Sequence, residues 1–145
     1  MDLSGWKWPL IILVVLVVVW LASSGGVNWM VKNFSKATPG QDEARDATDE
    51  AGLSRVAGYL CLMLRWQKAS DVLLLTMERY PNGKNYWFNL FRLAKCYEKM
   101  ERYQECYDIL QELMAINASQ FDPRVQENEN MLLRASKLKE LHELR

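Results

Sequence analysis

The stretch Glu101–Asn117, ERYQECYDILQELMAIN, decides how this chain folds. A charged turn is followed by an aromatic residue and then by apolar residues at the spacing of a helix. A similar stretch, Leu64–Pro81 (LRWQKASDVLLLTMERYP), lies 37 residues upstream. The residues that occupy the same places in the two copies are Trp66 and Tyr103, Ala69 and Cys106, and Leu73 and Leu110. The opening stretch is therefore the second half of a helix pair that occurs twice.

From Leu53 onward the apolar residues recur at helical spacing, and no stretch alternates in the manner of a strand. Turn residues at Tyr80–Gly83 and Ala118–Pro123 interrupt the pattern. We therefore predict an all-α domain over residues 53–144. Its helices are expected over about 53–65, 67–80, 86–100, 103–116 and 123–144.

The last of these helices has a start signal, with Asp122 as the expected cap and Pro123 as the first helical residue. Its predicted apolar face consists of Val125, Leu132, Ala135, Leu138 and Leu141. A helix with one apolar face is suited to cover the open end of a helical stack. We expect it to act as a C-terminal capping helix.

The doubled pattern resembles the tetratricopeptide repeat, a unit of about 34 residues made of two antiparallel helices. The matching positions are Trp66, Ala69 and Pro81 in the first copy, and Leu93, Ala94, Tyr97, Tyr103 and Cys106 in the second. The family's glycines are replaced by Ala57 and Ala94 in the first helices and by Leu64 and Glu101 in the tight turns, and Ala118 replaces the final proline. The resemblance covers about residues 53–119 and implies two degenerate repeats. A generic bundle of helical hairpins is the alternative.

The N-terminal region contains no charged residue between Lys7 and Lys32. A helix of that length, at about 1.5 Å per residue, crosses a hydrocarbon core of ~30 Å. Trp6, Trp8 and Trp29 lie near its two ends, at the level where indole rings prefer to sit. We predict an N-terminal transmembrane helix in residues 1–32, in contact with the lipid bilayer through residues 9–31.

A cleaved signal peptide is the alternative, with Lys7, the run Leu10–Leu21 and the segment ASSGG as its three regions. The apolar character resumes beyond that segment, at VNWMV, which favours an uncleaved single-pass anchor. The SSGG segment is a place where the helix can kink or fray. The side of the membrane stays undetermined, with a slight lean to a cytosolic domain from Lys32, Lys36 and Arg45.

Residues 33–52 form a polar, acidic linker. Two interpretations stay open, a solvated spacer and a short polar helix that Thr38 caps.

The composition excludes several classes of function. Lys plus Arg and Asp plus Glu number 18 each, so no strong positive field is available for nucleic acid. The sequence has no phosphate-binding loop, GxSxG, HExxH or CxxC motif, and its one histidine, His142, is expected on the surface of a helix end. We predict no enzyme, no cofactor, no metal and no small-molecule substrate.

The three cysteines are Cys61, Cys96 and Cys106. They lie among apolar helical residues, where a free cysteine acts as a small hydrophobe. A bridge between Cys96 and Cys106 is the alternative if the domain faces an oxidising compartment.

The resemblance implies that the first helix of each pair presents a groove to protein or peptide partners. Carried over position by position, the groove residues are Ser54, Arg55, Gly58 and Cys61 in the first copy, and Phe88, Phe91, Arg92, Lys95, Glu98 and Lys99 in the second. We take Arg55, Phe88, Phe91, Arg92, Lys95 and Lys99 as the candidate protein-binding residues. Such a set suits an acidic or carboxylate-ended peptide with an apolar side chain. In the alternative, the aromatic residues are core and the cations are solvated.

Two functions follow from these expectations. In the first, the chain is a small accessory or scaffold subunit of a larger membrane complex. In the second, it is an anchored adaptor or receptor that recruits soluble proteins or peptides, which includes assembly factors and chaperone assistants.

Overall fold

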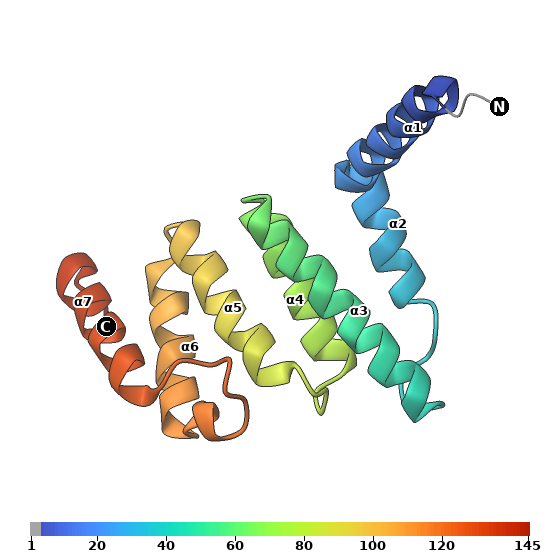
Figure 1. Cartoon of the computed structure of the whole chain (residues 1–145). Helices are drawn as coiled ribbons and strands as arrows, with labels where there is room; N and C mark the ends of the chain where they lie inside the picture. The colour runs from blue at the N-terminus through green and yellow to red at the C-terminus, as the bar shows by residue number, and fades with distance from the viewer. Residues whose placement is uncertain (1–3) are drawn as a thin grey trace. The chain divides into compact units, whose positions relative to one another are not determined.

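The computed structural model describes residues 4–145, and over these residues the chain forms helices, turns and loops without any strand. It divides into two compact units, one that ends at Lys36 and one from Ala37 to Arg145. The all-α fold class is confirmed, with an apolar N-terminal helix followed by packed helical hairpins (Figure 1).

The first unit consists of helix α1 (Ser4–Ala22) and helix α2 (Ser24–Phe34). The segment Gly5–Ala22 of α1 is long and apolar enough to cross a membrane, and none of it is buried. Length and composition of this kind also fit a signal sequence, so they establish only that α1 is one candidate span.

The SSGG segment divides this unit at Ser23. The Ser23 side chain caps α2 by accepting a hydrogen bond from the Gly26 amide at 3.3 Å, and it donates to the Trp20 carbonyl. A Cβ atom at Gly26 would lie 2.3 Å from that same carbonyl oxygen, so only glycine fits here. The N-terminal region is thus two helices and not the single helix predicted within residues 1–32.

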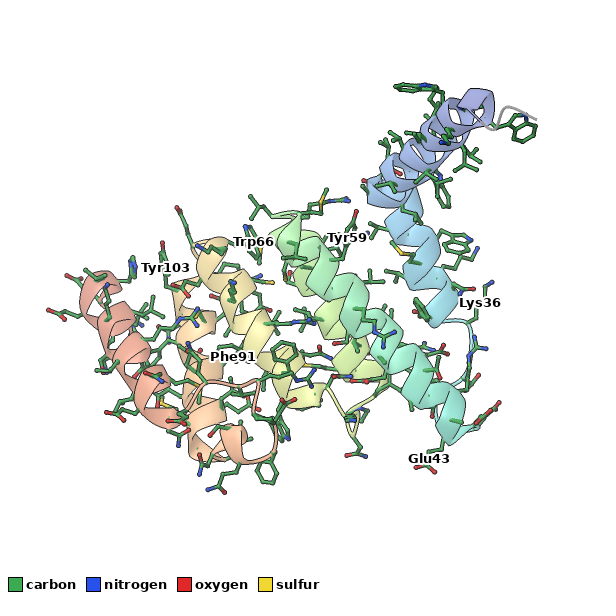
Figure 2. The ribbon with its side chains drawn as sticks, in the orientation of Figure 1. Lys36, Glu43, Tyr59, Trp66, Phe91 and Tyr103 are labelled. Carbon is green, nitrogen blue, oxygen red and sulfur yellow. The ribbon has the colours of Figure 1, made fainter. Side chains whose placement is uncertain are left out.

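The second unit is a succession of helices in which each packs on the one before it (Figure 1). They are α3 (Glu43–Leu62), α4 (Trp66–Arg79), α5 (Tyr86–Lys99), α6 (Tyr103–Ala115), the short 3₁₀ turn η1 (Ala118–Gln120) and α7 (Asn128–His142). Helices α3 and α4 make the first hairpin, and α5 and α6 the second. Trp66 and Tyr103, which open α4 and α6, lie along the same edge of this row, where the two hairpins turn (Figure 2).

The two hairpins turn with the same backbone geometry. Leu64 and Glu101, the positions where the repeat pattern expects glycine, are both left-handed, with φ of 57° and 61°. In the first turn the Arg65 amide donates to the Leu60 carbonyl at 2.9 Å, and in the second the Arg102 amide donates to the Tyr97 carbonyl at 2.9 Å. These bonds satisfy carbonyls that a helix end leaves free. The sequence repeat is therefore a structural repeat.

The core follows the same register in three helices. Each contributes a large, a small and another large buried residue at the spacing i, i+4, i+7, which places them on one helical face. The sets are Leu53, Ala57 and Leu60 in α3, Leu90, Ala94 and Tyr97 in α5, and Met131, Ala135 and Leu138 in α7. Ala69 and Cys106 are fully buried near the starts of α4 and α6. Helix α7 thus takes the place that the first helix of a third hairpin would occupy.

Two predicted boundaries are wrong. Helix α3 begins at Glu43 and not near Leu53, because Asp42 accepts hydrogen bonds from the amides of Ala44 and Arg45 and caps the helix there. Most of the predicted linker is therefore helical. Its last residues are also part of the core, since Asp49 and Glu50 are buried.

Helix α7 begins at Asn128 and not at Pro123. The Asp122 carboxylate accepts from the Arg124 amide at 3.0 Å and from the Arg124 guanidinium, which holds this segment in a turn. The predicted apolar face is correct at Ala135 and Leu138. Leu132 and Leu141 are exposed instead, and Val125 is buried in the loop before the helix.

Candidate protein-binding site

The candidate site is the surface where α3 and α5 meet, which we call the α3–α5 face. It is defined by Ser54, Gly58 and Cys61 of α3 and by Phe88, Arg92, Lys95 and Cys96 of α5. These two helices come together because α4 returns the chain and packs on both. At the centre, the Ser54 hydroxyl donates to the Asn89 side-chain oxygen at 2.7 Å, and both residues are buried.

Arg92 joins the two helices of this face. Its Nη1 donates to the Ser54 carbonyl at 2.7 Å and to the Ser54 hydroxyl at 3.3 Å. The guanidinium lies so close to Gly58 that a Cβ atom there would be 2.6 Å from Nη2. Burial lowers the pKa of Arg92, yet the group remains a cation because its reference value is far above neutral. Arg92 is therefore a fixed positive charge with part of its surface open to solvent.

Phe88 lies against two guanidinium groups. The Cζ atoms of Arg92 and Arg124 are each 4.3 Å from the centre of its ring, which is the range of a cation–π contact. Arg124 is held in place by Asp122, at 2.6 Å and 2.9 Å, and by the Asn85 side-chain oxygen at 2.8 Å. The cluster of Arg92, Phe88 and Arg124 is thus rigid and positively charged.

Sequence reasoning missed Arg124, because it assigned this residue to the first turn of a helix. The signal that would have found it is Asp122 two residues earlier. That spacing allows an aspartate to fold back on the following backbone amide and to pair with an arginine.

Among the described residues, no hydrogen bond, ion pair or ring contact joins the other four predicted residues to this cluster. Arg55, Lys95 and Lys99 are exposed, and Phe91 on α5 is half-buried (Figure 2). Phe88 and Arg92 are the pair that the fold brings into contact. Glu98, also assigned to the groove, forms an ion pair with Arg134, which connects α5 to α7.

The three cysteines are free. The sulfur atom that approaches Cys96 is that of Cys61, at 3.7 Å, so the alternative bridge between Cys96 and Cys106 is not formed. Cys106 is fully buried, and burial raises the pKa of its thiol to about 11. It fills the helix contact as the small residue of the repeat pattern.

Two clefts lie elsewhere on this unit. One of about 530 Å3 lies among α4, α5 and α6 and carries the acidic side chains of Glu78, Glu105, Asp108 and Glu112. Another of about 550 Å3 lies beside the start of α3 and the turn after α4, lined among others by Glu43, Asp46, Arg79 and Lys84. None of the six candidate binding residues lines either cleft.

Over residues 4–145, no group of three or more His, Cys, Asp and Glu side chains is gathered in a way that could hold a metal ion. No protein-family model, no curated protein and no solved structure matches the chain.

Proposed function

We propose that this chain is a non-enzymatic, membrane-anchored protein-interaction module that serves as a small accessory or scaffold subunit of a larger membrane complex. Helix α1 is the proposed single-pass anchor. At about 1.5 Å per residue its 19 residues reach about 28 Å, close to the thickness of a hydrocarbon core. Its exposed Val, Leu and Ile side chains would then face lipid.

We further propose that the hairpin unit is a tetratricopeptide-like domain of two degenerate repeats closed by α7. The left-handed turns at Leu64 and Glu101 support this, because they occupy the glycine positions of the family's pattern. So do the fully buried small residues Ala69 and Cys106, which let the helices of a pair approach closely. Domains of this kind bind proteins or peptides.

The observation that carries the subunit role is the outer surface of α7. The terminal helix of a helical stack needs a polar outer face to remain soluble. Among the exposed polar residues of α7, three leucines, Leu132, Leu133 and Leu141, are nevertheless 55%, 66% and 64% exposed. We take these exposed leucines as the surface that another protein covers. A permanent neighbour in a membrane complex would bury them continuously.

The test is purification of the full chain from its native membranes in a mild detergent. We expect membrane partners to remain bound at fixed stoichiometry. The double variant Leu133→Ser/Leu141→Ser should lose them while its helix content stays unchanged. The matched control is Leu74→Ser, which removes a 45% exposed leucine from α4, a helix inside the stack. Retention of the partners by the double variant, or the absence of any stoichiometric partner, would refute the subunit role.

The second candidate function is that of an adaptor, and the α3–α5 face favours it. Fixed cations at Arg92 and Arg124 beside exposed Arg55 and Lys95 would attract an acidic segment. An adaptor should bind such a peptide even without α1, and should release it on dilution or in high salt. The double variant Arg55→Glu/Lys95→Glu should abolish this binding, whereas the α7 double variant should not affect it.

A further inference from the structure

Cys61 and Cys96 form a close pair of thiols on the α3–α5 face. Their sulfur atoms are 3.7 Å apart, and neither is oxidised. A disulfide bond is about 2.05 Å long, so the sulfurs would have to approach by less than ~2 Å to bond. Cys96 is completely buried, whereas Cys61 is only half-buried and lies in the last turn of α3. A small reagent can therefore reach one sulfur of the pair but not the other.

The surroundings of Cys61 favour its thiolate. A hydrogen bond joins the two sulfur atoms, and this bond together with the positive charges of Arg92 and Lys95 lowers the pKa of Cys61 to about 7. For Cys96 the same hydrogen bond and its burial raise the pKa, so Cys96 keeps its proton. One sulfur is thus nucleophilic at neutral pH and its neighbour remains a thiol.

We propose that Cys61 and Cys96 form a peroxide-reactive dithiol, in which the accessible Cys61 attacks a hydroperoxide and the buried Cys96 resolves the product as a disulfide. This inference rests on the geometry of the two thiols and is independent of the function proposed above. The substrate class is hydrogen peroxide or a small organic hydroperoxide, because only a small molecule reaches a half-buried sulfur.

The chemistry proceeds in two steps. The Cys61 thiolate attacks the hydroxyl oxygen of the hydroperoxide, an S–O bond forms, the O–O bond breaks, and the remaining alkoxide or hydroxide leaves and takes up a proton from water. Cys61 is then a sulfenic acid. The Cys96 sulfur attacks the Cys61 sulfur, the S–S bond forms, the S–O bond breaks, and the hydroxyl group leaves as water with the proton of Cys96. Two thiols are oxidised, and one hydroperoxide is reduced to an alcohol, or to water, plus a further water.

The third cysteine provides an internal control. Cys106 is fully buried, and burial raises the pKa of its thiol to about 11. It therefore has little thiolate at neutral pH and no access to the reagent. Oxidation should spare Cys106 under conditions that consume the pair.

The experiment treats the full chain in detergent with hydrogen peroxide, alkylates the remaining thiols and maps the peptides by mass spectrometry. We expect an intramolecular Cys61–Cys96 disulfide and an alkylated Cys106. In Cys61→Ser, peroxide consumption should fall at least about tenfold, while Cys106→Ser should react at the rate of the unmodified chain. In Cys96→Ser, the sulfenic acid at Cys61 should persist and be trapped by dimedone.

Lys95→Met removes a positive charge at an exposed position and so tests the electrostatic contribution separately from the packing. It should slow the reaction several-fold without changing helix content, because one positive charge near the thiolate is lost. The proposal is overturned if peroxide produces no Cys61–Cys96 disulfide in the unmodified folded chain, if Cys106 is oxidised first, or if Cys61→Ser consumes peroxide at an unchanged rate.

Discussion

Leu64 occupies a left-handed backbone position that leucine does not favour. Its φ of 57° places its Cβ close to the following carbonyl, which costs an L-residue about 1–2 kcal/mol. Glycine avoids this cost, but its greater conformational entropy in the unfolded chain lowers stability by about 0.4–1 kcal/mol. Because the Leu64 side chain is 69% exposed, little packing is lost with it. Leu64→Gly should therefore raise the free energy of unfolding by about 0.5–1 kcal/mol in urea titrations.

The matched control for this substitution is the preceding residue. Met63 has a φ of −81°, which any residue adopts, so Met63→Gly brings only the cost of glycine and should lower stability by about 0.5–1 kcal/mol. Glu101, with a φ of 61°, should respond to glycine as Leu64 does. If glycine destabilised all three positions equally, the left-handed geometry of the turns would be wrong.

Asp122 should make stability depend on pH. Hydrogen bonds from Arg124 lower the pKa of its carboxyl in the folded chain, so the ionised form is favoured on folding. A depressed folded pKa contributes stability that is present above the unfolded value, about 3.9, and is lost as the pH falls through the folded value. We expect Asp122→Asn to lower the free energy of unfolding by about 1–2 kcal/mol at pH 7 and by clearly less near pH 2. Urea titrations at the two pH values measure this, and an equal loss at both would contradict the assignment.

At the scale of the elements, the sequence predicts correctly those helices whose limits follow the apolar pattern. It misplaces the helix starts that depend on a side-chain cap or turn. The predicted ranges for α4, α5 and α6 differ from the observed ones by no more than one residue at either end, because their apolar periodicity starts and stops with the helices. The starts of α3 and α7 depend on which aspartate caps and which one folds into a turn. Both Asp42 and Asp122 accept from the amide two residues on, but Asp42 also accepts from the amide three residues on, whereas Asp122 pairs with the Arg124 guanidinium.

At the candidate site, too, the sequence predicts which helices meet but not which side chains touch. The repeat register predicts correctly that residues of α3 and α5 share a face, because equivalent helices of adjacent hairpins are neighbours. The contacts within that face could not be predicted in this way. Arg124 reaches Phe88 from a loop after η1, and the partner of Cys96 depends on the crossing of two helices and not on spacing along the chain.

The break between α1 and α2 gives a prediction at this scale. A Cβ at Gly26 would lie 2.3 Å from the Trp20 carbonyl oxygen, so Gly26→Ala should force the two helices apart. The ring centres of Trp20 and Trp29 are 5.9 Å apart, so the two indoles should give a coupled signal in circular dichroism. In Gly26→Ala this signal should fall to the level seen in Trp29→Phe, which lacks one of the two indoles. In the control, Gly25→Ala, the new Cβ meets only the Ser23 hydroxyl at 3.6 Å, and the signal should persist. A persistent signal in Gly26→Ala would show that α1 and α2 do not cross so closely.

For the whole molecule, the division into two units implies that the hairpin stack can fold from its own contacts. The buried residues of α3 to α7 pack in sequence along one row, and every helix of the row has a neighbour within residues 37–145. Such stacks derive their stability from interfaces between adjacent elements, so removal of a segment outside the stack leaves these interfaces intact. Anchoring and folding should therefore be separable properties of this chain.

A fragment of residues 37–145 tests that separation. We expect it to keep its helical circular dichroism and to unfold cooperatively, with a midpoint within a few degrees of that of the full chain, and to remain in the supernatant when membranes are sedimented after carbonate extraction. The full chain should sediment with the membranes, because burial of α1 in lipid removes its exposed apolar surface from water.

The exposed leucines of α7 should cause the fragment to self-associate as its concentration rises, and Leu133→Ser/Leu141→Ser should suppress this. A fragment that lost its cooperative transition would show that the hairpin stack depends on the N-terminal unit, and a full chain released by carbonate would show that α1 does not span the bilayer.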